Sequence, residues 1–598
     1  MSVRRVAWLV RAALALPFVV ALIVLATTHW SPVLDLAMTE FRVRDVFSRH
    51  TPLIGLPGRI GTFPNQGSHP GPLSFYLLAP VYRLLGSTAY SLLVGAAIIN
   101  VGAAWTAVWV AQRRGGRRLV LGVGAVVMVL MAWLGASVLT QPWNPYLPLV
   151  SFVVVLLSTW AVLDGDHRML IPLVVAATLG AQTHVPYLSL NLTMCAVAFG
   201  AVGWRWWKAR AADRGEAKSV VLSVAVGVAL WLPVFVDQVR HDPGNITMLQ
   251  RHFLNPPEPP VGWGVGIKTV LAHFDVTHVV SASLGRSDYF IDALDGLAGG
   301  RWVIGALVLL AWLAAVAVSV RLADHRILRL HVVVGVAAAI GLFSTARIFG
   351  KVWYYLTLWS WSIALLAVAA TIWTFVSWWE AGGRARLPIG RVAVVATLLA
   401  GAVFVVDAAK VSPPEERLSR VLNAVVDPTA HALRDGVGAA DGVGGSYAVY
   451  WSDAYYFGSQ GFGLLDELER RGFDARASDT YRVPVTPHRV VRPGQVTAEV
   501  VLATGIYVAE WRARTDVVEV ADFEPRSAAE LQEFNRLRSE AIERLTALGL
   551  DDVVAMIDSN LFSARIDPRV PGDVERMLVR MLVLGEETAV FIAPPGTF

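Results

Sequence analysis

The sequence predicts an α-helical protein that crosses a membrane many times and ends in a separate α/β domain. Of its 598 residues, 55% are hydrophobic and 16% are charged, whereas a soluble domain carries about 25% charged residues. The mean hydropathy is +0.53, and apolar runs of spanning length fill the chain up to about residue 407. This composition excludes an ordinary soluble enzyme, a disordered chain and a nucleic-acid binder.

The apolar runs predict the membrane spans. A crossing needs about 20 apolar residues, and about eleven runs come near that length, at 12–28, 90–111, 119–139, 148–163, 169–182, 187–204, 219–236, 302–320, 331–346, 353–379 and 392–406. The first run follows Arg4 and Arg5 as a signal peptide would. No small-residue cleavage site follows it, so we expect a retained helix.

The distribution of basic residues predicts the orientation. Clusters of Lys and Arg follow the second, sixth, eighth and tenth runs, whereas the turns at 140–147 and 183–186 contain neither residue. Because basic loops stay on the cytoplasmic side, we expect a cytoplasmic N-terminus in the cytoplasmic membrane. An odd number of spans then places the tail outside.

Two predicted outer loops are long, at 29–89 and 237–301. The first contains an apolar stretch at 72–85 that is short and flanked by Pro and Gly, which predicts an interfacial helix instead of a crossing. The second contains Pro256-Pro257-Glu258-Pro259-Pro260, which predicts a stiff, extended segment.

The tail differs from the rest of the chain in charge and in pattern. Residues 408–598 hold 20 Lys and Arg against 29 Asp and Glu, a net charge of −9, whereas residues 1–407 hold 31 against 17, a net charge of +14. Strand-like segments at 446–451, 499–503 and 589–593 alternate with helix-like segments at 462–471 and 528–548. We therefore expect a transmembrane catalytic domain over 1–407 and a soluble, extracytoplasmic α/β domain over 408–598.

The polar chemistry gathers in the outer loops. The cores of the predicted spans contain almost no Asp, Glu, Lys or Arg, although ion-coupled transporters place such groups near the midplane. This pattern favours a site at the outer face and a lipid-borne substrate. Asp35 follows the first run closely, and a carboxylate held there can act as general base on a hydroxyl nucleophile; a solvated acid or a helix cap is the alternative.

Other outer residues are candidates for contacts with a sugar. Trp143 and Asn144 can stack on a sugar and bind its hydroxyls, although Trp also anchors membrane interfaces. Gln182 and His184 lie in another tight outer turn. Glu40 is included among the candidate sugar or acceptor contacts, although helix geometry does not place it on the same face as Asp35.

Three residues are candidates for binding a phosphate. Arg347 and Lys351 lie at the outer end of the ninth run, against the positive-inside tendency; a lipid-linked phosphate would explain them, and headgroup snorkelling is the alternative. His69 precedes the interfacial helix and can hydrogen-bond a phosphate or a sugar, or pack on the Pro-rich start of that helix. Asp45 is expected to pair with Arg44 on the surface.

Together these residues resemble the GT-C superfamily of membrane glycosyltransferases, which use polyprenyl-phosphate sugars. The resemblance covers roughly 1–405 and is nearest to actinobacterial members distantly related to the protein mannosyltransferase and aminoarabinose transferase group. It rests on Asp35, His69-Pro70-Gly71-Pro72-Leu73, Trp143-Asn144-Pro145, Gln182-x-His184 and Arg347…Lys351. The resemblance implies that Asp35 is the catalytic base and that Arg347 and Lys351 hold the donor phosphate. Many relatives carry paired acids, whereas Leu36 follows Asp35, so we expect a single base and no metal.

The sequence therefore predicts an inverting glycosyltransferase that moves a sugar from a polyprenyl-phosphate donor to an acceptor hydroxyl of a cell-envelope glycan or glycolipid. No cofactor is expected, and the partners are the lipid bilayer, the lipid-linked sugar and the acceptor, not nucleic acid. The alternatives are a lipid or polysaccharide transporter or flippase, and a non-catalytic scaffold of cell-envelope assembly.

Overall fold

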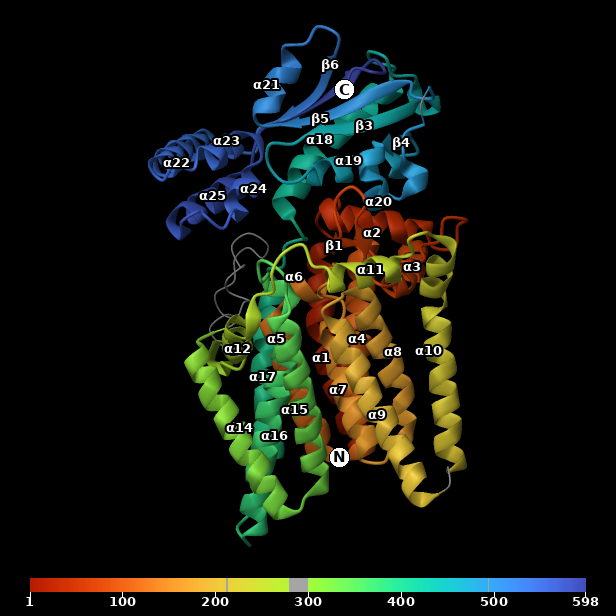
Figure 1. Ribbon diagram of the computed structural model, residues 1–598, viewed down its shortest axis with the longest axis vertical. Helices are drawn as coiled ribbons and strands as arrows, with labels where there is room; N and C mark the ends of the chain where they lie inside the picture. Colours follow the sequence, from red (N-terminus) through yellow and green to blue (C-terminus); the bar gives the residue numbers. More distant parts are fainter. Residues whose placement is uncertain (211–212, 279–299, 493) are drawn as a thin grey trace.

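Long apolar helices stand side by side and carry a sheet-containing domain at one end, while the N-terminus lies at the opposite end (Figure 1). The computed structural model describes residues 1–210, 213–278, 300–492 and 494–598. Within those residues, nine helices are long and apolar enough to cross a membrane: α1 (Val3–Leu25), α4 (Ala89–Arg114), α5 (Arg117–Leu134), α9 (Tyr187–Ala209), α10 (Arg214–Arg240), α14 (Trp302–Leu322), α15 (His325–Ala346), α16 (Ser360–Ala381) and α17 (Ile389–Ala408).

Two further predicted runs form the shorter helices α7 (Leu149–Leu163) and α8 (Leu170–Thr183). The predicted fold class, a polytopic helical membrane protein with a C-terminal α/β domain, is confirmed. One detail differs, because α1 begins at Val3 and so includes Arg11. Arg11 lies just before the predicted start of the span at residue 12. Its Nη2 donates to Gln112 Oε1 at 3.3 Å, so the Arg11 side chain has a polar partner within the helical bundle.

Ion pairs hold the helix ends together on the side of the N-terminus. Asp164 and Asp166 follow α7 and pair with arginines from the end of α4 and the start of α15. The Arg113 Nε lies 2.8 Å from Asp166 Oδ2, and the Arg326 Nε lies 3.3 Å from Asp164 Oδ2. Arg114 and Arg329 also pair with Asp164.

The two long loops that were predicted to lie outside carry short elements. The first contains α2 (Leu34–Asp45), the antiparallel pair β1 (Pro57–Ile60) and β2 (Gly67–Ser68), and α3 (Leu73–Leu84), the helix expected at 72–85. The second contains α11 (Asn245–Leu254) and α12 (Gly262–His273). After the proline-rich segment, Pro260 forms an antiparallel bridge with Phe349. Residues 279–299 of this loop lie outside the described residues.

The tail is built on a five-stranded mixed sheet with the order β4-β3-β5-β7-β6. Strand β3 pairs in parallel with β4 and β5, and β7 pairs antiparallel with β5 and β6. Their bounds are Ser446–Ser452 for β3, Asp474–Ala477 for β4, Ala498–Thr504 for β5, Val518–Phe523 for β6 and Thr588–Ala593 for β7. The three predicted strands are present, and β4 and β6 extend the sheet at its two edges.

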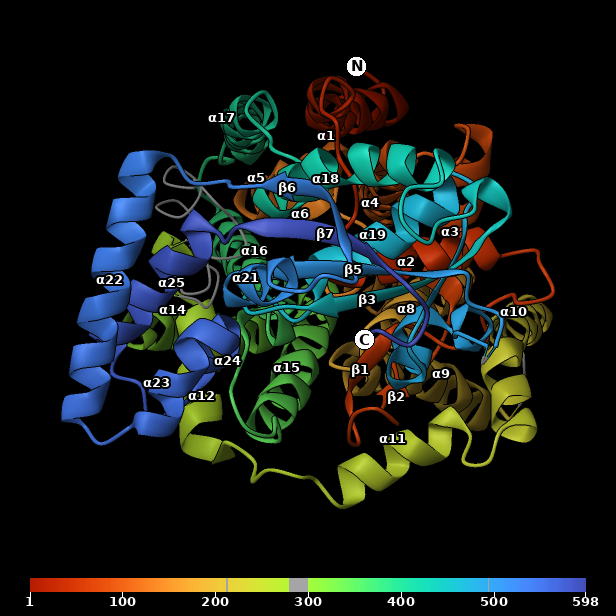
Figure 2. The same ribbon diagram turned by 90° about the horizontal axis from the view of Figure 1, so that it is seen from above.

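Helices cover both faces of this sheet. Helices α18 (Glu416–Arg434) and α19 (Ser459–Arg470) lie between the sheet and the bundle, and α21 (Ile506–Arg512) lies on the outer face (Figure 1). Helices α22 (Ala528–Ala547), α23 (Asp551–Ser559), α24 (Leu561–Ile566) and α25 (Gly572–Leu584) extend to one side (Figure 2). The short helix α20 (Arg482–Val485) follows β4.

One apolar cluster joins the tail to the first of these two loops. Val33, just before α2, and Ala37 and Phe41 within it are fully buried. They belong to the same cluster as Leu418 and Leu422 of α18. Before α2, the Trp30 Nε1 donates to the Pro414 carbonyl and the Ser31 N donates to Ser419 Oγ, each at 2.8 Å. The tail is therefore packed firmly on the element that carries Asp35.

Candidate active site at the tail-facing end of the bundle

Asp35 lies in the first turn of α2. Val33 before it is extended, and Leu34 has a φ of 49°, a left-handed conformation that costs a residue with a Cβ about 1–2 kcal/mol. The chain thus turns sharply from the segment that touches the tail into α2. This turn fixes the direction in which Asp35 leaves the helix.

The Asp35 carboxylate is half-buried and is held by an indole. Trp143 Nε1 donates to Asp35 Oδ2 at 2.8 Å. Burial raises the pKa of Asp35, while the Trp143 hydrogen bond and the charge of Arg42 lower it, and the net direction is upward. A carboxylate with a raised pKa is a stronger base than an ordinary aspartate.

Aromatic side chains surround this hydrogen bond. Trp143 packs edge-on against Tyr146 and Tyr355, with ring centroids 4.8 and 5.1 Å apart. The hydroxyls of Tyr146 and Tyr354 are 2.5 Å apart, and Trp353 stacks on Tyr355 at 6.2 Å. We call these five residues the aromatic platform. Asn144 is buried in the same turn as Trp143. Aromatic faces of this kind suit a sugar ring, which offers apolar C–H groups.

The structure brings the predicted histidines together beside the platform. The ring centroids of His69 and His184 are 5.2 Å apart, and His184 lies 6.1 Å from Tyr355. Burial lowers the pKa of His69 to about 4, and burial together with the neighbouring His69 lowers the pKa of His184 well below its usual value. Both rings are therefore neutral near pH 7. Since His69 Nδ1 accepts from the Val185 N at 3.2 Å, the hydrogen of His69 sits on Nε2, which is a donor.

Gln182 was predicted to contact a sugar, but its side chain is engaged in hydrogen bonds inside the protein. It is fully buried, its Nε2 donates to the Leu230 carbonyl at 2.8 Å, and its Oε1 accepts from the Leu73 N at 3.2 Å. Its own carbonyl accepts from the Gly71 N at 3.1 Å. Gln182 thus ties α8 to α10 and to the start of α3, and it fixes the segment that carries His69.

The two predicted cations lie apart from each other. Lys351 is exposed, with its Nζ 5.2 Å from the centre of the Trp353 ring and 3.6 Å from Glu575 Oε1 of α25. Lys351 therefore borders the aromatic platform. The guanidinium of Arg347, also exposed, lies 6.0 Å from the Phe349 ring, on the side of α11.

Arg59 of β1 is a cation at this site that the sequence reasoning missed. Its side chain is 68% exposed, and its Nη2 is 3.9 Å from Glu258 Oε1. Burial raises the pKa of Tyr355, the charge of Arg59 lowers it and the charge of Asp35 raises it, so Arg59 and Asp35 both act on the Tyr355 hydroxyl. The rule that identified Arg347 and Lys351, a cation in a predicted outer loop, applies to Arg59 as well.

Glu40 does not join the site. It is fully buried and accepts from the Tyr82 hydroxyl at 2.7 Å, while Arg470 Nη2 lies 2.5 Å and Arg44 Nη2 lies 3.1 Å from it. Burial acts to raise the pKa of Glu40, but the charges of Arg470 and Arg44 outweigh it and hold the pKa below its ordinary value. Glu40 therefore stabilises the contact between α2 and α19.

The expectation that Asp45 pairs with Arg44 on the surface is wrong. Asp45 is buried, and its two oxygens accept from Arg489 Nη1 and Nη2 at 2.7 and 2.9 Å. Arg44 reaches Asp466 of α19 instead, at 2.8 Å. Both partners belong to the tail, more than 400 positions along the chain, so no local pattern could indicate them.

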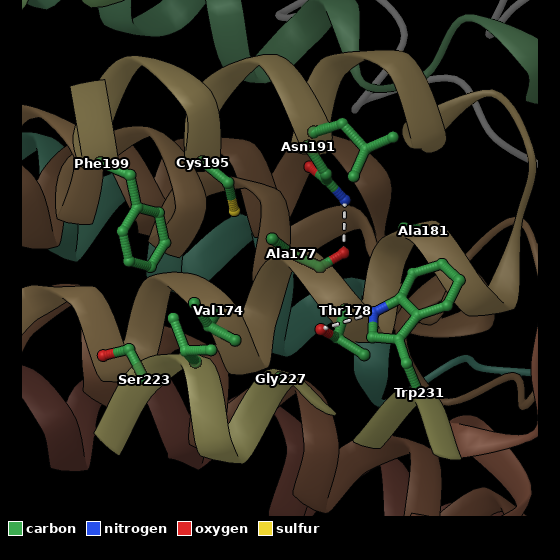
Figure 3. A pocket seen from close by; sticks show the side chains of 12 residues that line it. Val174, Ala177, Thr178, Ala181, Asn191, Cys195, Phe199, Ser223, Gly227 and Trp231 are labelled. Atoms are coloured by element: carbon green, nitrogen blue, oxygen red, sulfur yellow. Dashed lines mark hydrogen bonds between the residues drawn. The ribbon is translucent and has the colours of Figure 1, made fainter. Parts of the chain in front are cut away.

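A groove opens between α8, α9 and α10, with a volume of about 180 Å³ (Figure 3). Its polar groups are mostly engaged: Trp231 Nε1 donates to Thr178 Oγ1 at 3.3 Å, and Asn191 Nδ2 donates to the Ala177 carbonyl at 3.0 Å. Cys195 lines the same groove. Leu230, the residue before Trp231, accepts from Gln182, so the groove ends just below the segment that carries His69.

The described residues contain no group of three or more His, Cys, Asp or Glu side chains arranged to hold a metal ion. The charged groups described near the aromatic platform are the Asp35 carboxylate, the pair of Lys351 with Glu575 and the pair of Arg59 with Glu258.

No protein-family model matches the chain, and no curated protein matches it. Among solved structures, the chain is similar to ArnT from Cupriavidus metallidurans in the apo state, with a TM-score of 0.47 and 13% identity over 86% of this chain and 96% of that one. It is also similar to the archaeal oligosaccharyltransferase AglB from Archaeoglobus fulgidus, in complex with an inhibitory peptide and a dolichol-phosphate. There the TM-score is 0.34, with 10% identity over 82% of this chain and 69% of that one. At these sequence identities the similarity concerns the backbone and not the side chains of the site.

Proposed function

We propose that this protein is an inverting glycosyltransferase of the GT-C type, which moves a sugar from a polyprenyl-phosphate donor to an acceptor hydroxyl at the outer face of the cytoplasmic membrane. One observation carries the proposal. A half-buried carboxylate, Asp35, is hydrogen-bonded by Trp143 at the end of an apolar helical bundle, beside an aromatic platform and exposed cations.

Asp35 acts as the general base. Because the indole of Trp143 holds Oδ2, we assign the proton transfer to Oδ1. As Oδ1 takes the proton of the acceptor hydroxyl, the hydroxyl oxygen forms a bond to the anomeric carbon. The bond from that carbon to the donor phosphate breaks on the opposite side, and the polyprenyl phosphate leaves with the electron pair. This in-line displacement inverts the anomeric centre, and phosphate needs no strong general acid to leave.

Cations at the margin of the platform stabilise the leaving phosphate. We assign this role to Lys351, whose Nζ lies 5.2 Å from the Trp353 ring, and to Arg59, whose charge acts on Tyr355, whereas Arg347 lies beside Phe349. His69 is neutral, so its contribution is a hydrogen bond from Nε2 and not a charge. Trp143, Asn144 and His184 contact the sugar, whereas Gln182 and Glu40 shape the site without lining it.

The groove between α8, α9 and α10 receives the isoprenoid chain of the donor. It lies at the level of the membrane core, its lining is mainly apolar, and hydrocarbon is the material available to fill such a space in a bilayer. Its end near Leu230 adjoins Gln182, which ties it to the His69 segment. A chain in this groove would place its phosphate at the tail-facing end of the bundle.

The test is transfer by the full-length protein in vesicles. Polyprenyl-phosphate mannose and polyprenyl-phosphate arabinose, each radiolabelled, serve as donors, and envelope lipids and glycans serve as acceptors. Asp35→Asn should lower transfer at least 100-fold, because a general base typically contributes a factor of about 10²–10⁴. The matched control is Asp242→Asn, an exposed acid of the second outer loop, which should leave the rate unchanged.

Three outcomes would contradict this function. Full transfer by Asp35→Asn removes the proposed mechanism. Movement of labelled lipid across the membrane without formation of a new glycosidic bond would indicate a flippase. Product with a retained anomeric configuration would exclude the single displacement.

A further inference from the structure

Lys351 has a counter-ion that belongs to the tail. Its Nζ lies 3.6 Å from Glu575 Oε1 of α25 and 5.2 Å from the centre of the Trp353 ring. Trp353 stacks on Tyr355, and Tyr355 packs against Trp143 with ring centroids 5.1 Å apart. Glu575 therefore brings the tail to the edge of the aromatic platform, where it holds a cation that we assign to the donor phosphate.

Glu575 has a second cationic partner inside the tail. Arg565 Nε of α24 lies 4.0 Å from the same Glu575 oxygen. Arg565 is 5% exposed and its guanidinium lies 5.8 Å from the Phe562 ring, which packs on Tyr456 with centroids 4.8 Å apart. The Glu575 carboxylate thus stays beside a fixed cation even when Lys351 turns to another anion.

The other cation that we assign to the phosphate is arranged in the same way. Arg59 Nη2 lies 3.9 Å from Glu258 Oε1. A Cβ at Gly350 would collide with the Glu258 carboxylate, and the Gly350 N donates to the Pro259 carbonyl at 3.3 Å. Glu258 therefore lies against the residue that precedes Lys351. Cations and carboxylates alternate along this edge, and we call its members the charged rim: Arg59, Glu258, Lys351, Glu575 and Arg565.

The two ion pairs that involve the assigned cations are loose. Their N–O distances of 3.6 and 3.9 Å exceed the usual hydrogen-bond length of about 2.7–3.2 Å. The side chains of Lys351 and Glu575 are 46% and 36% exposed. By contrast, Arg489 lies 2.7 Å from Asp45 with both side chains buried. Exposed ion pairs contribute little to stability, so a more highly charged anion can replace the carboxylate at small cost.

The proposed reaction produces such an anion. The donor phosphate is a diester with a single negative charge, whereas the released polyprenyl phosphate is a monoester, which carries about 1.5 to 2 negative charges at neutral pH. A cation that stabilises the leaving phosphate therefore binds the product more tightly than the donor. Release of the product is then slow unless another anion competes for that cation.

We propose that Glu575 is a positioning residue of the tail that competes with phosphate for Lys351 and so promotes release of polyprenyl phosphate. Lys351 turns from Glu575 to the phosphate during transfer and returns to Glu575 as the product leaves, while Arg565 remains beside the carboxylate. The tail then takes part in every reaction cycle. This inference rests on the proposed function, in which Lys351 meets the donor phosphate.

The first test measures binding of the product without any transfer. Radiolabelled polyprenyl phosphate is the probe, and the full-length protein is held in phosphatidylcholine nanodiscs without acceptor. Glu575→Gln should bind the probe about threefold more tightly, a gain of the size of an exposed ion pair. Glu575→Asp keeps the charge and should bind nearly as the wild type does. The control Asp573→Asn removes an acid of the same helix that pairs with Arg544 of α22, and it should bind as the wild type does.

A double-mutant cycle tests whether the effect passes through Lys351. Lys351→Gln should weaken binding of the probe, and adding Glu575→Gln to it should restore nothing. In the transfer assay, polyprenyl phosphate should inhibit Glu575→Gln at about threefold lower concentration than the wild type. The KM for the donor should change less, because the diester carries less charge. A purely structural role of Glu575 would not separate these two constants.

Several results would overturn the inference. Equal or weaker binding of the probe by Glu575→Gln removes the competition. The same gain in the Lys351→Gln background would mean that Glu575 repels phosphate directly. An equal gain with phosphatidylglycerol as the probe would assign the pair to ordinary lipid headgroups. If Asp35→Asn abolishes transfer while Glu575→Gln binds polyprenyl phosphate as the wild type does, the inference fails and the proposed function stands.

Discussion

The Trp143 indole is the residue-scale feature that tunes Asp35. Trp143→Phe keeps an aromatic ring and removes the N–H that donates to Oδ2. Because this bond stabilises the charged carboxylate, its loss should raise the pKa of Asp35 further. A hydrogen bond to a charged group contributes about 1.5–3 kcal/mol, so the acidic limb of kcat/KM should move upward by about one to two pH units.

The measurement is a pH series of kcat/KM for Trp143→Phe against Trp204→Phe. Trp204 is a 62% exposed residue of α9, far from the site in sequence, and its variant should titrate as the wild type does. An acidic limb of Trp143→Phe that stays in place, or that moves downward, would contradict a stabilising bond to the carboxylate.

The residues also show how far a sequence can lead to a site. Asp35, Trp143, His69 and His184 share one cluster, since each lies next to the end of an apolar run and such ends meet at one face of a bundle. The charge pairs of Glu40 and Asp45 were not predicted, because their partners Arg470 and Arg489 come from a domain whose docking no local pattern encodes.

At the scale of elements, the groove between α8, α9 and α10 yields a prediction for donor binding. A Cβ at Gly227 would lie 3.3 Å from Val174 Cγ1, so Gly227→Phe would place a ring inside the groove. We expect KM for the polyprenyl-phosphate donor to rise about tenfold with kcat retained, because the chain loses apolar contacts that are made equally in the ground and transition states.

The matched control is Gly203→Phe on α9, where a Cβ meets open space. Donors with short isoprenoid chains provide a second check, since they should lose less affinity than long ones. Equal KM values for the wild type and Gly227→Phe with a long-chain donor would show that the chain lies elsewhere.

The elements also differ in how well sequence indicates them. Strands β5 and β7 are fully buried along their length, so their apolar sequences predicted them. Strands β4 and β6 are edge strands, and β6 is exposed at half of its positions, so neither forms a continuous apolar run. Helix α11 is ten residues long, and helices of this length depend on tertiary contacts for their stability.

At the scale of the whole molecule, buried charges lock the tail onto α2. Arg489 is 4% exposed and pairs with Asp45 of α2 and with Glu469 of α19. His488 Nε2 also lies 3.4 Å from Asp45 Oδ1. Burial acts to raise the pKa values of Asp45 and Glu469. Hydrogen bonds from His488 and Arg489 outweigh it at Asp45, the hydrogen bond and charge of Arg489 outweigh it at Glu469, and both pKa values lie below their ordinary range.

Arg489→Leu should therefore loosen the tail in a manner that depends on pH. Removing one partner of a buried pair costs about 3–5 kcal/mol, because the remaining charges stay buried and uncompensated. The two carboxyls have lowered pKa values in the native protein, so their contribution to stability is present above the ordinary pKa values of 3.8 and 4.5 and is lost as the pH falls. In the variant the same carboxyls can escape the penalty by binding protons. The difference in Tm between the wild type and Arg489→Leu should thus be large at pH 7 and shrink toward pH 4, with faster hydrogen exchange in α19 at pH 7.

The control is Arg536→Leu, which removes a 65% exposed guanidinium that lies 3.7 Å from Glu540. It should change Tm little at either pH, because surface pairs contribute about 0–1 kcal/mol. A Tm difference for Arg489→Leu that is small, or that grows on acidification, would mean that apolar packing and not these charges holds the tail in place.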